Sequence, residues 1–486
     1  MEENKFDKEL LKLAVETANK SGADEVIAKL IEKKKHQIRF SSSSIDVNKE
    51  WQNYSLDVFV SKRPLLSFTG KMDTVTIQDP DKEKIKKIIP KKVKVLDSLP
   101  KSKLYWGVDE ETYNSNPSID LYDDKMENFQ EKGPELVKKM IQSAEEGGAK
   151  KTAGVLYSET KKTGILTHSG NGGDYKSSFC RATIRSFYDE ESSGQGVIAT
   201  RNLSNFRERS QKIGKKSGKL SKRGAGSEVG KPGTYDLIMS PVVGANIFGN
   251  LLNGANPITI LSGMSCLKGK KNEKIGPEEL NIKDDPLIKE GLNSRPFDDE
   301  GTPSEKTDII KDGELKNLIH NTSTAKLWSF INKIKLKFWI TADSTSNSVL
   351  GQMGMTNTEE NPKMLMPRAS NYRFSPGDYT LQEIISTSSK PTIYLTSNWY
   401  TRFTNMSEGE FSTVPRDAMF LIEDGEIKKP IKGLRLKENL VDMCENIEAI
   451  GKDVKQVRWW EVNTPTFIPT IKVKNCKFTK AKEKKE

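Results

Sequence analysis

The first part of the chain shows two kinds of hydrophobic periodicity. Residues 7–21 place apolar side chains on one face at a spacing of about 3.6 residues, which predicts an amphipathic helix. Residues 26–30 and 54–60 alternate between apolar and polar side chains, so each is predicted to form a strand with one buried face. A second helix, predicted over residues 81–89, should stop at Pro90 because proline has no backbone N–H to donate. A helix followed by antiparallel strands favours an α+β domain.

The middle of the chain continues this alternation of helix and strand. An irregular polar segment at residues 98–116 precedes a helix that is predicted to begin at Pro134, because proline is favoured in the first helical turn. The two glycines at residues 147–148 should end this helix. Strand-like patterns then follow at residues 152–157, 164–168, 177–189 and 196–202.

A basic stretch at residues 211–231 is rich in glycine, serine and lysine and contains one acidic residue, Glu228. This composition predicts an exposed linker between domains, and a phosphate-binding role for its glycines is the weaker interpretation. The predicted organisation is therefore an N-terminal α+β domain, a β-rich middle segment that continues it, a linker and a C-terminal β-rich domain. These parts are residues 1–95, 96–210, 211–232 and 233–480.

The C-terminal part has short strands and strong turn signals. Asp-Gly pairs at residues 312–313 and 424–425 lie between alternating apolar residues, a pattern typical of hairpins with a tight type I′ turn. A helix is predicted over residues 438–450, with Cys444 as a small core residue on its apolar face. The predicted fold class is α+β, with an antiparallel sheet in the N-terminal domain and a strand-rich C-terminal domain with few helices.

Composition narrows the class of protein. The 486 residues suffice for two or three domains, and they contain no apolar run of about 18 residues and no signal-peptide core at the charged N-terminus. The four cysteines form no CxxC pair, which fits a reducing compartment, so a cytoplasmic location is expected. The net charge is +11, but most lysines alternate with acidic residues, which favours surface ion pairs over a nucleic-acid-binding surface.

Six short phrases in the C-terminal half carry a family resemblance. They are Gly291–Pro303, Lys311–Leu315, Met366–Tyr372, Pro376–Ile385, Phe420–Ile427 and Ile450–Asp453. In this order and spacing they resemble the TldD/PmbA family. The resemblance implies a cytoplasmic two-subunit peptidase whose subunits enclose a cavity for unfolded or short peptides. It also implies that a TldD-type subunit carries a zinc-binding HExxxH helix and a Cys ligand near the C-terminus. The PmbA-type subunit, also called TldE, would have the same fold and no metal site.

Both regions that correspond to the zinc ligands lack them in this chain. The HExxxH helix should lie within residues 242–255, which contain no His or Glu and offer Asn246, Asn250 and Asn253 instead. Neutral amides are poor zinc ligands and cannot act as bases near neutral pH. The region of the Cys ligand, residues 456–466, has no Cys. We therefore predict no catalytic residue, no metal ligand and no cofactor, with the three asparagines lining a vacant metal-site helix.

Other chemical groups offer weaker candidates. His320 and His168 are isolated in the sequence and are interpreted as packing or surface residues, with a hydrolase built around either one as a remaining alternative. The acidic run at residues 298–300 could bind a cation, but a solvated turn is the favoured interpretation.

Four residues are candidates for a cavity or a subunit interface. Arg368 and Asn371 either support their own loop or line such a surface, and Trp459 and Trp460 are of the aromatic type that anchors interfaces. The leading hypothesis is a non-catalytic PmbA/TldE-like subunit that binds an HExxxH-bearing TldD-type partner, or itself, and processes peptides with it. The alternative is an independent homo-oligomeric protein that binds peptides or regulates without peptidase activity. Neither hypothesis involves a membrane or nucleic acid.

Overall fold

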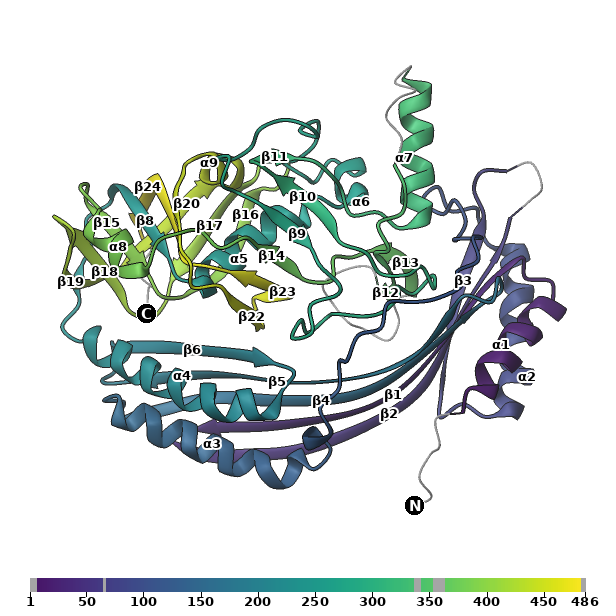
Figure 1. The fold of residues 1–486 in the computed structure, drawn as a ribbon, viewed down its shortest axis with the longest axis horizontal. Helices are drawn as coiled ribbons and strands as arrows, with labels where there is room; N and C mark the ends of the chain where they lie inside the picture. Colours follow the sequence, from purple (N-terminus) through teal and green to yellow (C-terminus); the bar gives the residue numbers. More distant parts are fainter. Residues whose placement is uncertain (1–6, 64–66, 336–341, 353–362, 482–486) are drawn as a thin grey trace.

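The computed structural model describes residues 7–63, 67–335, 342–352 and 363–481. A long curved sheet from the N-terminal half lies beneath a strand-rich C-terminal half (Figure 1). This arrangement is the α+β architecture that the sequence predicts. None of the helices in the described ranges is long and apolar enough to cross a membrane.

The N-terminal sheet has six antiparallel strands in the order β3-β2-β1-β4-β5-β6. Its central strand β1 is paired along nearly its whole length with β2 on one side and β4 on the other, so the sheet is long as well as wide. The predicted strands at residues 152–157 and 164–168 are two parts of the single strand β4. The strands are β1 (Glu25–Ser41), β2 (Ser44–Lys62), β3 (Lys71–Gln78), β4 (Lys151–Thr167), β5 (Gly172–Phe187) and β6 (Ser193–Thr200).

Four helices cover one face of this sheet and leave the other face toward the C-terminal half (Figure 1). Val26, Ala28 and Leu30 of β1 are buried with the first two helices, and Ile38 and Phe40 are buried with the third. Because alternate strand residues share a face, all four helices lie on the same side of the sheet. These helices are α1 (Glu9–Lys20), α2 (Lys82–Val95), α3 (Phe129–Glu146) and α4 (Leu203–Arg223). Two short 3-10 turns are η1 (Leu96–Ser98) and η2 (Asp124–Met126).

The C-terminal half contains two larger sheets and a separate hairpin. The strands of the larger sheet are β7 (Glu228–Val229), β8 (Gly233–Met239), β15 (Thr392–Leu395), β16 (Asn398–Asn405), β17 (Glu410–Pro415), β18 (Met419–Glu423), β19 (Glu426–Lys432), β20 (Leu434–Asn439), β21 (Ile447–Ile450) and β24 (Ile471–Lys480). The second sheet is formed by β9 (Ile282–Asp284), β10 (Thr307–Lys311), β11 (Glu314–Leu315), β14 (Tyr372–Phe374), β22 (Lys455–Trp459) and β23 (Val462–Ile468). The hairpin pairs β12 (Ser348–Gln352) with β13 (Lys363–Pro367).

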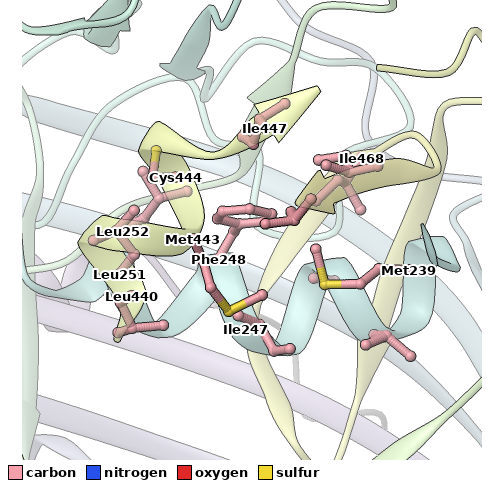
Figure 2. Close-up of a cluster of buried hydrophobic side chains, with 14 of the residues drawn as sticks. Met239, Ile247, Phe248, Leu251, Leu252, Leu440, Met443, Cys444, Ile447 and Ile468 are labelled. Atoms are coloured by element: carbon pink, nitrogen blue, oxygen red, sulfur yellow. The ribbon is translucent and has the colours of Figure 1, made fainter. Parts of the chain in front are cut away.

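Helix α5 (Pro241–Asn253) lies between these two sheets and contacts strands of both. Its side chains Ile247, Phe248 and Leu251 belong to the largest apolar core of the protein, together with Met443 and Cys444 of α9 (Leu440–Glu445) (Figure 2). Cys444 is fully buried there, as the sequence predicts. The remaining helices are α6 (Pro257–Leu261), α7 (Thr322–Ile334) and α8 (Leu381–Ser386).

Both predicted Asp-Gly hairpins are present. The pair at residues 312–313 joins β10 to β11, and the pair at residues 424–425 joins β18 to β19. Both residues of each pair have positive φ, between 51° and 76°, as a type I′ turn requires.

Two predicted helix boundaries are wrong because burial outweighs the effect of a proline. Helix α2 continues through Pro90 to Val95, since Ile89 and Val93 extend the row of buried side chains that packs on the sheet. Helix α3 begins at Phe129 instead of Pro134, since the buried Phe129 ring anchors an earlier first turn.

The predicted helix over residues 438–450 is also wrong in its second half. Only residues 440–445 are helical, and residues 447–450 form strand β21. This segment pairs with β24, whose backbone supplies the hydrogen bonds that a longer helix would have supplied internally.

The predicted linker at residues 211–232 is wrong over residues 211–223, which form the second half of helix α4. Gly214, Ser217, Gly218 and Ser221 are buried on one face of this helix. Their small side chains let α4 lie close to α3, so what the composition suggests to be a flexible linker is a helix-packing surface. The domain boundaries themselves stay a prediction.

Candidate functional site

Helix α5 occupies the place where the sequence predicts a vacant metal-site helix. It starts directly after strand β8, with Pro241 in its first turn, where a missing N–H costs no helical hydrogen bond. The helix is apolar on nearly every side because it is packed between two sheets. Polar side chains on it are therefore exceptional, and each needs an internal partner.

Asn246 is the best buried of the three asparagines on α5 and is 2% exposed. Its amide nitrogen donates to the backbone oxygen of Glu461 at 3.0 Å and to the Glu461 carboxylate at 3.3 Å. Its amide oxygen accepts hydrogen bonds from the Asn398 amide at 3.0 Å and from the Thr401 hydroxyl. Both ends of the Asn246 amide are thus occupied inside the protein.

Asn250 and Asn253 follow Asn246 at helical spacing but do not converge with it on one point. The Asn250 amide donates back to the Asn246 carbonyl at 2.8 Å. Asn253 is exposed, and its side-chain oxygen accepts a hydrogen bond from the Tyr372 hydroxyl at 3.1 Å. The three side chains therefore act as structural hydrogen-bonding groups of α5.

The donors around α5 do not fit zinc. Zinc requires thiolate, imidazole or carboxylate ligands, and here the helix supplies only amides that are already hydrogen bonded. Within the described ranges, no group of three or more His, Cys, Asp or Glu side chains could hold a metal ion. No zinc-dependent step follows from these residues.

An aromatic patch, formed by the partly buried Trp399 and the exposed Tyr400 and Trp460, lies beside the Asn246 network. The three rings contact one another edge to face, with centroid distances of 5.4 to 6.1 Å. Trp460 is 49% exposed and Tyr400 is 45% exposed, whereas the adjacent Trp459 is buried in the core. Exposed rings in contact are typical of protein interaction sites, so Trp460 remains a candidate for an interface while Trp459 serves packing.

Glu461 connects this patch to α5, and sequence reasoning did not single it out. Its carboxylate accepts the Tyr400 backbone N–H at 2.9 Å as well as the Asn246 amide. Tyr400 has a φ of 56°, an uncommon backbone conformation for a residue with a side chain, and this hydrogen bond helps to hold it. No sequence signal could have revealed the link, because Asn246 and Glu461 are far apart in the chain.

Arg368 and Asn371 lie in different surroundings. Asn371 is fully buried; its amide donates to the Asp285 carbonyl and the Ser294 hydroxyl and accepts the Asn293 backbone N–H. These contacts support loops. Arg368 is exposed and donates to the Gln352 carbonyl at 2.7 Å, so its role at a cavity or interface stays a prediction.

Among the described residues, neither candidate histidine hydrogen-bonds a carboxylate that could orient it for catalysis. His320 is buried against Trp328, and burial, followed by the charge of Lys271, lowers the pKa of its imidazole to about 4. His168 lies in a turn, and the hydroxyl of the neighbouring Ser169 bonds Thr167 instead of the imidazole. Both residues have the surroundings of packing or turn residues.

The acidic run at residues 298–300 is buried, so the prediction of a solvated turn is wrong. Asp298 is fully buried and accepts backbone N–H groups, one of them from Ser348 at 2.8 Å. Asp299 accepts the Lys29 ammonium at 2.6 Å and the Leu350 N–H at 2.7 Å. The run connects the C-terminal half to strand β1, and sequence alone could not show this because the covering residues are remote in the chain.

Replacing Glu300 by glutamine is expected to flatten the pH dependence of stability. Burial, and then the charge of Asp298, raise the pKa of the Glu300 carboxyl. The folded chain thus holds a proton that the unfolded chain releases, so stability is full below the ordinary Glu pKa and falls as pH rises through the raised pKa. Glutamine keeps an acceptor for the Ser348 hydroxyl, which bonds Glu300 at 2.9 Å, but cannot ionise. Urea unfolding between about pH 5 and about pH 9 should show a smaller loss in the variant, and equal losses would contradict this assignment.

Comparisons with known proteins identify the family of the C-terminal half. The model of the PmbA/TldA metallopeptidase C-terminal domain matches residues 232–480, about half of the chain. A metalloprotease of Methanothermobacter thermautotrophicus is 27% identical over 250 residues, which are 51% of this chain and 50% of that protein. The metalloprotease PmbA of Escherichia coli O157:H7 is 25% identical over 229 residues, which are 46% of this chain and 43% of that protein. The chain thus spans about half the length of the relatives that it matches.

A solved structure extends the likeness of the fold to nearly the whole chain. The crystal structure of TldE from Thermococcus kodakarensis superimposes with a TM-score of 0.81 over 97% of this chain and 100% of that one. Its sequence identity is 18%, so this match concerns the fold alone.

Proposed function

The chain belongs to the PmbA/TldD metallopeptidase family, and on this premise we propose that it is a non-catalytic, TldE-like subunit of a cytoplasmic peptidase complex. In this role it binds a partner that carries the HExxxH zinc site and contributes a wall of the peptide cavity. It supplies neither the metal ligands nor the general base of the reaction.

One observation carries this proposal, namely the chemistry of α5. A peptidase zinc site needs an open coordination position and a carboxylate beside the bound water. Both the nitrogen and the oxygen of the Asn246 amide are instead hydrogen bonded inside the protein, to Glu461, Asn398 and Thr401. The Glu461 carboxylate does not serve as the base either, because it accepts hydrogen bonds from the Asn246 amide and the Tyr400 backbone N–H. These hydrogen bonds support the interpretation that the polar side chains of α5 stabilise the fold and do not bind metal.

The aromatic patch is the surface that we propose for the partner contact. Trp460 and Tyr400 combine large apolar area with few rotatable bonds, which lowers the entropic cost of binding. The Glu461 carboxylate accepts the Tyr400 backbone N–H, so the patch is held in place before a partner binds.

The test is to purify the chain from its own cells and to measure bound metal and accompanying proteins. We expect zinc well below one equivalent per chain, no peptidase activity of the isolated chain, and recovery together with an HExxxH-bearing protein. That partner, measured in parallel, serves as the control and should hold zinc. Stoichiometric zinc in the isolated chain, with activity lost on chelation, would refute the proposal. Recovery of a pure homo-oligomer without a peptidase would favour the independent peptide-binding or regulatory protein instead.

A further inference from the structure

The face of the N-terminal sheet that looks toward the C-terminal half carries several basic residues between two ion pairs that join the halves. One is the Lys29–Asp299 ion pair at 2.6 Å. The other is the Arg185–Asp417 ion pair at 2.7 Å. Lys29 and Arg185 both project from this face, so the sheet surface between them also faces the C-terminal half. This surface includes Lys33, Lys35, Tyr157, Glu159, Lys161 and Arg181.

Strand register brings these residues together. Lys33 of β1 lies directly opposite Lys161 of β4. Lys35 of β1 lies opposite Glu159 of β4, and Tyr157 of β4 lies opposite Arg181 of β5. Directly opposed residues share a face, and the side chains of such pairs are neighbours. Two lysines opposite each other repel, so this register carries an electrostatic cost in the free protein.

The C-terminal half adds a further cation to this surface. Arg458 lies on β22, a strand that packs on β5 and β6 of the N-terminal sheet. Burial, followed by the charge of Arg181, lowers the pKa of the Arg458 guanidinium to about 10. Burial likewise lowers the pKa of Arg181. The two guanidinium groups are thus near each other and partly withdrawn from water.

The Glu159 carboxylate offsets these charges only in part: its charge acts on Lys33, Arg181 and Arg458 against the lowering of their pKa values by burial. Glu159 pairs with Lys35 at 3.6 Å, and Asp57 pairs with Lys363 of β13. Among the described residues, Lys33, Lys161, Arg181 and Arg458 form no ion pair with a carboxylate. Partly buried cations that outnumber the nearby carboxylate reduce stability, and such an arrangement is typical of a site that an anionic ligand completes.

We propose that Arg181 and Arg458, with Lys33 and Lys161 on the same face beyond the Lys35–Glu159 pair, bind carboxylate groups of an acidic peptide in an extended conformation. This proposal rests on the proposed peptide-binding function and deepens it by naming the class of peptide. Each guanidinium group offers a planar set of donors that matches a carboxylate. Alternate side chains of an extended peptide lie about 7 Å apart on one face, so several carboxylates can reach the basic surface at once.

The state of the Tyr157 ring favours a peptide over single-stranded nucleic acid. Nucleic-acid sites of this kind use free aromatic faces on which bases stack. The Tyr157 ring is already covered by the Arg181 guanidinium at 4.8 Å, and its hydroxyl accepts a hydrogen bond from Gln37 at 2.6 Å.

The test measures fluorescence anisotropy of the full-length chain with a labelled peptide of alternating Glu and Thr, and with its Gln/Thr analogue. We expect binding of the Glu peptide and at least about tenfold weaker binding of the Gln analogue. The R181Q/R458Q variant should lose about tenfold in affinity for the Glu peptide, and R181K/R458K should be intermediate because lysine keeps the charge but not the planar donor set. The matched control K219Q/K222Q removes two exposed charges from α4, on the opposite face of the sheet, and should change affinity by less than about twofold.

Thermal unfolding distinguishes a binding role from a structural one. If the arginines serve binding, R458Q without peptide should unfold at the same temperature as the wild type or higher, because a repulsive contact is relieved. A lower unfolding temperature, or equal binding of the Glu and Gln peptides, would overturn the proposal. Tighter binding of an oligothymidylate of equal charge, with the same dependence on both arginines, would assign the surface to nucleic acid instead. All these measurements use the isolated chain, so they can fail while the metal analysis and co-purification still support the proposed subunit role.

Discussion

Replacing Lys29 by methionine should lower the free energy of unfolding by about 3–5 kcal/mol. Lys29 reaches from strand β1 to the Asp299 carboxylate at 2.6 Å, and the two side chains are 13% and 7% exposed. Burial opposes both charges, yet their attraction more than offsets it: the pKa of Lys29 is raised and the pKa of Asp299 is lowered. Methionine fills a similar volume but leaves the carboxylate buried and without its counter-charge.

The measurement is urea unfolding followed by tryptophan fluorescence, with two variants as controls. K29M/D299N removes both charges and keeps an acceptor for the Leu350 N–H, so it should recover part of the lost stability. K8M removes the exposed Lys8–Asp174 pair, whose side chains are 60% and 46% exposed, and should cost less than about 1 kcal/mol. If K29M costs no more than K8M, then the Lys29–Asp299 pair does not hold the two halves together.

Local patterns in the sequence were sufficient for much of the fold. The alternation along residues 26–30 and 54–60 predicted strands that exist, and both Asp-Gly turns form hairpins with the required backbone angles. These features depend on neighbours in the chain, which is why a single sequence can reveal them. The errors at Pro90 and Pro134 have the opposite cause, since packing against remote elements outweighed a local preference.

The candidate site was predictable only where residue identity decides the chemistry. The absence of His and Glu from residues 242–255 could be read directly, whereas the partners of Asn246 could not. Its contacts with Asn398 and Glu461 exist because two sheets close around α5. The acidic run at residues 298–300 shows the same limit, since its burial depends on strands β1 and β12.

Helix α4 illustrates how composition can mislead. Glycine and serine lower helix propensity and are common in linkers, so residues 211–223 looked flexible. In the folded chain the same residues occupy one face at helical spacing and allow backbone-to-backbone contact with α3. The close approach of α3 therefore determines which residues this helix tolerates.

The consequence can be tested with Gly218→Ala, which should destabilise the protein by about 1–3 kcal/mol. On propensity alone, glycine to alanine inside a helix stabilises by up to about 1 kcal/mol. At residue 218, however, the added Cβ would lie 2.0 Å from the Ala144 carbonyl oxygen and 3.1 Å from the Gly147 carbonyl carbon. Both atoms belong to the backbone, so the clash can be relieved only by moving α3 away from α4. That movement would disturb the apolar side chains buried between α3 and the sheet.

Gly249→Ala is the matched control, because it makes the same substitution inside another helix. Residue 249 lies on α5, and a Cβ added there would meet no atom within 4 Å apart from its chain neighbours and the backbone of its own helix. Helix propensity should then dominate, and the variant should gain about 0.5–1 kcal/mol. Urea unfolding of both variants beside the wild type gives the two differences directly. Opposite signs would establish that contact with α3 governs residue 218, whereas a gain in both would mean that α4 does not lie this close to α3.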